Sequence, residues 1–144
     1  MMDNIFGIAG TALNAQLTRM NATASNLANA STVASSDQEA FRAKRPLFRA
    51  IVDDMINKSN TNNTQDTRGG VKIEKLIDDP APVRRQFDPH SPVADKDGYV
   101  YQSNVNEVSE MVEMMAAARS YQNSVETVNT AKHLMMRTLD VMRS

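Results

Sequence analysis

The chain has 144 residues, a net charge of −1 and no cysteine. Its length fits a single domain, its near-neutral charge gives no electrostatic reason to bind nucleic acid, and the lack of cysteine excludes disulfides and thiolate metal sites. Residues 1–17 have no basic start and an interrupted apolar run, which predicts neither a cleaved secretory signal nor direct insertion into a membrane.

The first predicted element is a helix over residues 4–29, which ends where Asn26 and Asn29 disfavour a helix interior. Its apolar residues recur at steps of three, four and seven, as in helices that pack against other helices. The stripe consists of Phe6, Leu13, Leu17, Met20 and Leu27. Residues 1–35 carry one acidic and one basic residue, so we expect this helix to be buried in surroundings that this small chain cannot supply alone.

The middle of the chain, residues 34–103, is predicted to be irregular and rich in β-structure. A short strand is expected over 41–44, and Pro46 would end it. Apolar residues at helical spacing then predict a short helix over 47–57. The segment 57–70 is low in complexity and almost free of apolar residues, which predicts a flexible loop.

Further along the middle region, strand and turn signals alternate with prolines. Alternating apolar residues predict a strand over 71–77. Four prolines then indicate extended, irregular segments: Pro80, Pro82, Pro89 and Pro92. Asp97-Gly98 is typical of a hairpin turn, and it would lead into a strand over 99–101.

The last predicted element is a helix over residues 105–142, capped by Asn104 with Glu107 three residues later. It would extend roughly 57 Å, far beyond the helix of about 11–12 residues that is usual in globular proteins. Apolar residues fall at alternating steps of three and four, interrupted only by Lys132. The stripe includes Met111, Met114, Tyr121, Val125, Val128, Met135, Leu139 and Met142. The chain is therefore predicted to be mostly α-helical with a small β-rich middle.

One arrangement of side chains could be imagined to hold a metal ion. It consists of Asp88, His90, Asp95 and Asp97. The run from Asp95 to Gly98 is similar to a calcium-binding loop only superficially, because the glycine comes too early and the terminal glutamate is missing. We favour the alternative, a solvated turn rich in aspartate and proline.

A small basic cluster admits two interpretations. It consists of Arg42, Lys44, Arg45 and Arg49. It could bind a phosphate or a lipid headgroup, but a solvated face, or charge complementarity with a neighbouring subunit, is the interpretation we favour. No nucleophile elbow, phosphate-binding loop or dinucleotide-binding glycine pattern occurs in the sequence.

Two sets of short motifs stand out along the chain. The first is Ala24-Ser25-Asn26-Leu27-Ala28-Asn29. The second runs through Asp88-Pro89, Gly98-Tyr99, Asn104-Val105 and Glu110-Met111. The first motif resembles the N-terminal signature of bacterial flagellar rod and hook proteins, and the second series is similar to the proximal-rod proteins of the FlgC type. The resemblance covers nearly the whole sequence.

This resemblance implies a structural subunit that has no enzymatic activity, no cofactor and no small-molecule substrate. It implies that the terminal segments 1–33 and 104–144 pair as an antiparallel coiled coil inside the assembly, with 34–103 outside. Such proteins leave the cell by type III export and assemble helically in the periplasm, in the basal body of the flagellum. Their partners are copies of themselves, other proximal and distal rod proteins and the export-gate adaptor. The rod transmits torque from motor to hook.

Two other functions fit the sequence less well. A small helical export chaperone or binding module would need a compact, stable monomer or dimer with both helices ordered. A metal-dependent hydrolase built on Asp88, His90 and Asp95 would need a bound metal ion.

Overall fold

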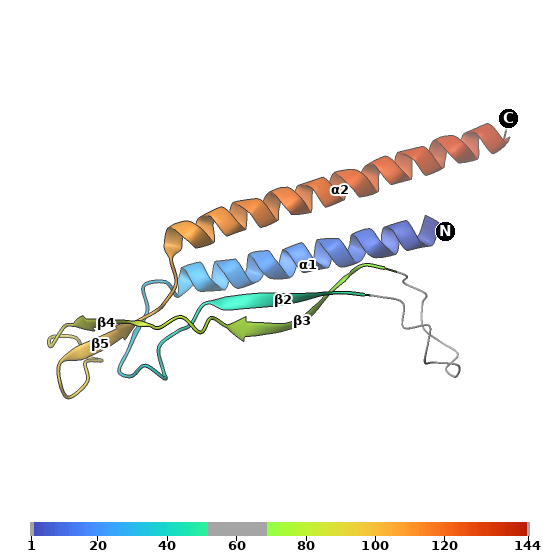
Figure 1. Cartoon of the computed structure of the whole chain (residues 1–144). Coiled ribbons are helices and arrows are strands. Elements are labelled where there is room, and N and C mark those ends of the chain that lie inside the picture. The colour runs from blue at the N-terminus through green and yellow to red at the C-terminus, as the bar shows by residue number, and fades with distance from the viewer. Residues whose placement is uncertain (1, 52–68, 144) are drawn as a thin grey trace, which may run out of the picture.

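The computed structural model describes residues 2–51 and 69–143, with two long helices and two small sheets (Figure 1). The elements in chain order are α1 (Met2–Ala28), β1 (Val33–Ala34), β2 (Lys44–Ala50), β3 (Val71–Asp78), β4 (Arg84–Phe87), β5 (Tyr99–Gln102) and α2 (Glu107–Arg143). This confirms the prediction of long helices at both ends with a small β region between them. None of the helices in the described part is long and apolar enough to cross a membrane.

Helices α1 and α2 lie side by side and run in opposite directions (Figure 1). Asn26, near the end of α1, is bonded to Glu110 in the first turn of α2. At the other end, Phe6 lies across a crevice from Met135. Because α2 has 37 residues and α1 has 27, α2 continues beyond the N-terminal end of α1.

The ribbon formed by β2 and β3 covers α1 on the side away from α2 (Figure 1). The end of the ribbon where β2 stops and β3 begins contacts α1 at Thr11. The Thr11 hydroxyl accepts a hydrogen bond of 3.2 Å from the Val71 amide. A Cβ atom at Gly70 would lie 2.6 Å from the same hydroxyl oxygen, so only glycine fits there. We expected that this chain could not bury α1 alone, and this is only partly correct. Helix α2 covers one side of α1 and the β2–β3 ribbon covers another, while Ile5 and Leu17 remain about half exposed.

Strand β2 corrects two predictions. Residues 47–50 belong to this strand and not to a helix. They are paired with β3, and the last pair of the register is Ala50 with Val71. The remainder of the predicted helix, 52–57, lies outside the described residues, as does most of the predicted loop 57–70. Pro46 does not end the strand but lies within it, opposite Leu76. Proline is tolerated there because β2 is paired with β3 alone in its two-stranded sheet. Its other edge is open, and a residue without a backbone N–H loses no hydrogen bond on that side.

The second sheet has the strand order β1-β5-β4 and is antiparallel throughout. The predicted strand after Asp97-Gly98 is confirmed as β5, whereas its partner β4 lies in a segment that was predicted to be extended and irregular. Gly98 has a φ of 81°, which favours glycine. The Asp95 carboxylate accepts hydrogen bonds from the amides of Asp97 (2.9 Å) and Tyr99 (2.8 Å), which fixes the turn before β5.

The start of α2 lies two residues later than predicted. Asn106 is the N-cap, since its side-chain oxygen accepts a hydrogen bond of 3.1 Å from the amide of Ser109. The predicted cap by Asn104 with Glu107 is wrong, because the side chain of Asn104 is engaged with the middle region instead. The best-buried residues gather around this point, where the end of α1, the start of β2 and the start of α2 meet. They include Ala22, Asn26, Ala43, Val105, Glu110 and Ala117.

Candidate functional site

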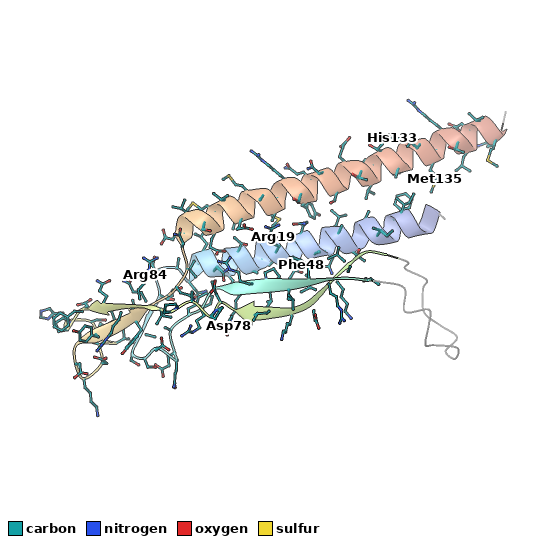
Figure 2. The ribbon with its side chains drawn as sticks, viewed as in Figure 1. Arg19, Phe48, Asp78, Arg84, His133 and Met135 are labelled. Carbon is teal, nitrogen blue, oxygen red and sulfur yellow. The ribbon has the colours of Figure 1, made fainter. Side chains whose placement is uncertain are left out.

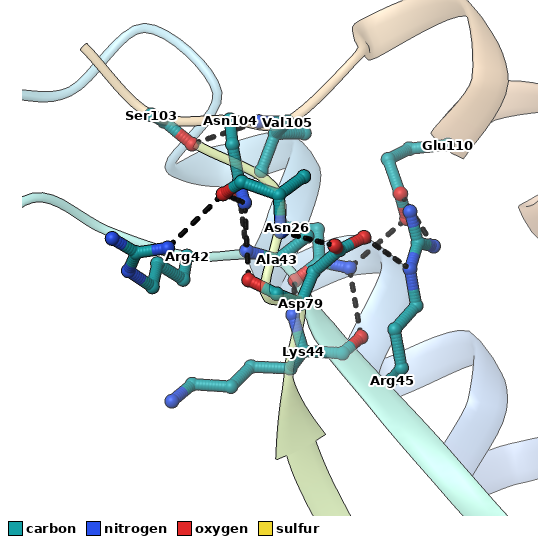
Figure 3. A network of polar contacts seen from close by, with 11 residues as sticks. Asn26, Arg42, Ala43, Lys44, Arg45, Asp79, Ser103, Asn104, Val105 and Glu110 are labelled. Atoms are coloured by element: carbon teal, nitrogen blue, oxygen red, sulfur yellow. Dashed lines mark hydrogen bonds and ion pairs between the residues drawn. The ribbon is translucent and has the colours of Figure 1, made fainter. Parts of the chain in front are cut away.

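Asn26 is the centre of a buried polar network that joins three segments (Figure 3). Its side chain is 1% exposed. Its amide nitrogen donates to the Lys44 carbonyl and to the Glu110 carboxylate, each at 3.0 Å. Its amide oxygen accepts from the Lys44 amide at 2.7 Å. One side chain therefore satisfies both backbone groups at the start of β2 while it holds the first turn of α2.

Glu110 brings a charge into this network. It is 0% exposed, and burial of a carboxylate is costly unless the charge is paired and hydrogen-bonded. Arg45 provides the pairing, with its guanidinium 2.7 Å from a carboxylate oxygen of Glu110. The same guanidinium lies 3.5 Å from the Asp79 carboxylate. We define the polar junction as Asn26, Arg45, Asn104 and Glu110.

Asn104 closes the other side of the polar junction (Figure 3). Its side-chain oxygen accepts from the Ala43 amide at 2.8 Å, and its nitrogen donates to the carbonyls of Asp79 (3.3 Å) and Ala81 (2.9 Å). The Ala43 carbonyl in turn accepts from the Asp79 amide at 2.8 Å. Asn104 thus ties the segment before α2 to both strands of the β2–β3 ribbon at one end, next to the start of β2 and the end of β3.

The remaining motif residues occupy turns and the small sheet. Asn29 terminates α1, because both its side chain (2.8 Å) and its amide (3.2 Å) donate to the Ser25 carbonyl. Ala24, Ser25 and Ala28 are exposed, and Leu27 is half-buried. In the second sheet, Asp88 donates from its amide to the Gly98 carbonyl at 2.9 Å. A Cβ atom at Gly98 would lie 3.2 Å from Pro89.

The predicted stripe on α2 is covered along only part of its length. Ala117, a neighbour of the stripe, is completely buried against α1. The half-buried members are Met114, Tyr121, Val125, Val128 and Met135. Met111, near the start of α2, is about half exposed, while Leu139 is 55% and Met142 78% exposed. On α1, the stripe residues Phe6, Leu13, Met20 and Leu27 are half-buried, and Leu17 is about half exposed.

The alternative sites weighed from sequence gain no support among the residues of 2–51 and 69–143. No group of acidic and histidine side chains there could hold a metal ion. Asp95 uses its carboxylate for the turn before β5. The basic cluster is paired within the chain: Arg42 with Asp37, Lys44 with Asp78, Arg45 with Glu110, and Arg49 with Glu74. Apart from the pair of Arg45 with the buried Glu110, these ion pairs lie at partly or fully exposed positions, which is compatible with the favoured solvated face.

Two features of this site were not predicted. The sequence stripe omitted Val108, Val112 and Met115, which are exposed on α2. Their spacing of four and three residues was the signal that could have found them. Arg45 was placed in a surface cluster, and no local pattern indicates its partner Glu110, 65 residues away.

Comparison with known proteins gives two matches that bracket the middle region. Residues 6–33 match the family described as "Flagella basal body rod protein", and residues 96–141 match the "Flagellar basal body rod FlgEFG protein C-terminal" family. The flagellar basal-body rod protein FlgC of Yersinia enterocolitica is 46% identical over 94% of both chains. The FlgC proteins of Salmonella typhimurium and of Buchnera aphidicola from Acyrthosiphon pisum are 44% and 41% identical, over 94% and 96% of both chains.

This chain belongs to the FlgC family of flagellar basal-body rod proteins. Three residues of the polar junction lie in the matched segments: Asn26 in the N-terminal one, and Asn104 and Glu110 in the C-terminal one. The two family segments are therefore held together by direct contacts between them. In this FlgC family member, the motif residues Asn26 and Asn104 form hydrogen bonds that connect the helices to the middle region.

Proposed function

We propose that this chain is a structural subunit of the proximal rod of the bacterial flagellum, the drive shaft that transmits torque from motor to hook. Its relatives are basal-body rod proteins, which are structural and not enzymatic. The observation that carries the proposal is the apolar stripe of α2 that passes beyond α1, where Leu139 and Met142 remain exposed. Apolar surface of this kind gains free energy when a neighbouring subunit covers it.

We further propose that α1 and α2 pair as an antiparallel coiled coil in the inner layer of the rod. The opposite directions of the helices and the spacing of three and four residues along α2 support this packing. The small sheet then lies at the far end of the molecule, next to the start of α2 (Figure 1). The polar junction would transmit load between the helices and the middle region, because it bonds to both.

The proposed location is the basal body in the periplasm, reached by type III export. The proposed partners are the other proximal and distal rod proteins, the export-gate adaptor and further copies of this chain. Helices whose apolar residues remain partly exposed in one copy gain stability from assembly, since a partner that binds only the folded state stabilises it. This supports assembly at the growing end of a filament over the existence of a rigid free monomer.

Leu139→Glu tests the proposed function. Covering one leucine side chain is worth about 1.5–3 kcal/mol, and a buried carboxylate would add a further cost. We expect the variant to remain soluble and helical but to fail to form rods, so that a strain carrying it as its sole copy does not swim. Thr130→Glu, at an exposed polar position of the same helix, is the matched control and should support rods. Normal rod formation with Leu139→Glu would refute the proposal.

A further inference from the structure

The pairing of β2 with β3 is interrupted at one place, where β3 has an extra residue. Leu47 lies opposite Lys75, but the next residue of β2, Phe48, lies opposite Ile73. Glu74 is therefore opposite no residue of β2 and forms a β-bulge on β3. A bulge of this kind bends the strand that carries it and increases the local twist of the pair.

The bulge decides which side chains of β3 face α1. Successive residues of a regular strand face opposite sides of the sheet, so residues three positions apart would point in opposite directions. Ile73 and Leu76 are three positions apart, yet both line a groove between β3 and α1, together with Val71. The extra residue at Glu74 accounts for this, because it shifts the alternation by one position. All three apolar side chains therefore remain on the side of the ribbon that faces α1.

The strand that lies against α1 also changes along the ribbon. Near the polar junction, Pro46 and Phe48 of β2 line a groove with Arg19 of α1. Toward the N-terminal end of α1, residues of β3 line a second groove that includes Thr11. Between these places the two strands cross in the view of Figure 1, as expected of a strongly twisted pair (Figure 1). The bulge at Glu74 lies in the part of the ribbon where this change takes place.

We propose that the bulge at Glu74 is a conformational device that twists the ribbon so that both of its ends are anchored on α1. One anchor is the polar junction, where Asn26 bonds to the amide and the carbonyl of Lys44. The other anchor is Thr11, whose hydroxyl accepts from the Val71 amide. The bulge thereby allows one small ribbon to cover α1 from its C-terminal end to its N-terminal half. This inference does not depend on the proposed function.

Deletion of Glu74 removes the bulge without disturbing the pattern of side chains. In the shortened strand Ile73 and Leu76 are two positions apart, so regular alternation directs both toward α1. The pairs on either side of the bulge can all remain, because Leu47 already lies opposite Lys75 and its neighbour opposite Ile73. What is lost is the local twist. Since the polar junction is held by several hydrogen bonds and an ion pair, the anchor at Thr11 should be released first.

Hydrogen exchange of two amides, followed by NMR on the purified full-length chain, separates pairing from anchoring. The Ile51 amide donates to the Gly70 carbonyl at 2.9 Å and reports the pairing of the two strands. The Val71 amide donates to the Thr11 hydroxyl and reports the anchor. We expect deletion of Glu74 to speed exchange at Val71 about fivefold or more, while exchange at Ile51 changes by less than about twofold.

Three further variants serve as controls. Glu74→Ala keeps the bulge and removes only the exposed ion pair of its side chain, so both exchange rates should stay within about twofold of those of the unchanged protein. Deletion of Lys75 also removes the bulge, because Glu74 then takes its place in the pairing, and it should reproduce the effect of deleting Glu74. Deletion of Lys72 should speed exchange at both amides, since it places Val71 and Ile73 on opposite faces of the strand.

Three outcomes would overturn the proposal. Unchanged exchange at Val71 after deletion of Glu74 would mean that the bulge does not hold the ribbon on α1. Loss of protection at Ile51 in the deletions of both Glu74 and Lys75, or failure of both to fold, would mean that the extra residue is needed for pairing itself. Faster exchange at Val71 in Glu74→Ala would assign the effect to the side chain and not to the bulge. The proposed function is tested separately by Leu139→Glu.

Discussion

Replacement of Asn26 by alanine removes the centre of the polar junction. The three hydrogen bonds of Asn26 reach the amide and carbonyl of Lys44 and the buried carboxylate of Glu110. Asn26→Ala leaves all three of these groups without that partner, in a place that water does not reach freely. The variant therefore combines lost bonds with uncompensated burial of polar groups.

The structure sets the size of the expected loss. Two neutral hydrogen bonds contribute about 1 kcal/mol each, and a bond to a charged group contributes about 1.5–3 kcal/mol. Alanine recovers up to about 0.7 kcal/mol through its higher helix propensity. We therefore expect Asn26→Ala to lower the free energy of unfolding by about 3–4 kcal/mol, a large share of the roughly 5–15 kcal/mol typical of a domain.

Urea denaturation of the purified full-length chain, followed by far-ultraviolet circular dichroism, measures this loss. Asn21→Ala is the matched control, because Asn21 is an exposed asparagine on the same helix. We expect it to change the free energy of unfolding by less than about 0.5 kcal/mol. If Asn26→Ala and Asn21→Ala unfold at the same urea concentration, the polar junction does not hold the elements together.

Two further pairs of variants test the structure by the same measurement. Glu110→Gln should lower the free energy of unfolding by about 1.5–3 kcal/mol. Its control, Glu113→Gln, should lower it by less than about 1 kcal/mol, because the ion pair of Glu113 with Arg19 is partly exposed. Equal effects of the two variants would contradict the role of burial at Glu110. Gly98→Ala should destabilise by about 1–2 kcal/mol because Gly98 has a φ of 81°. Its control, Gly10→Ala, should stabilise the protein by about 0.5–1 kcal/mol, because Gly10 lies in α1 with open space around it. If Gly98→Ala also stabilised the protein, the turn geometry at Gly98 would be refuted.

The long helices could be predicted because their signals are local and repeated. Apolar spacing over many turns defined both, and Asn29 marked the end of α1, where it bonds to Ser25. Strand β2 was assigned wrongly for the complementary reason. Leu47 and Phe48 fit a helical spacing over a short stretch, but pairing with β3 and contact with α1 determine their structure. Short apolar segments are decided by tertiary contacts that sequence spacing does not contain.

The polar junction could not be derived from sequence patterns. Asn26 and Glu110 are 84 positions apart, and nothing in either neighbourhood indicates the other. The cap of α2 shows the same limit, because Asn104 and Asn106 are both suitable N-cap residues. The choice between them depends on the Ala43 amide, which engages Asn104 and leaves Asn106 to cap the helix. Motif resemblance identified Asn26, Asn104 and Glu110, but only the structure gives their roles.

Hydrogen exchange of the α2 amides, in the free chain and in assembled rods, tests the central claim that the uncovered stripe is buried between subunits. In the free chain we expect slow exchange over residues 110–121, near the polar junction, and fast exchange over 131–143. In rods the amides of 131–143 should become as protected as those near the junction, because a neighbour covers Leu139 and Met142. Equal protection of both segments in the free chain, with no change on assembly, would contradict the claim.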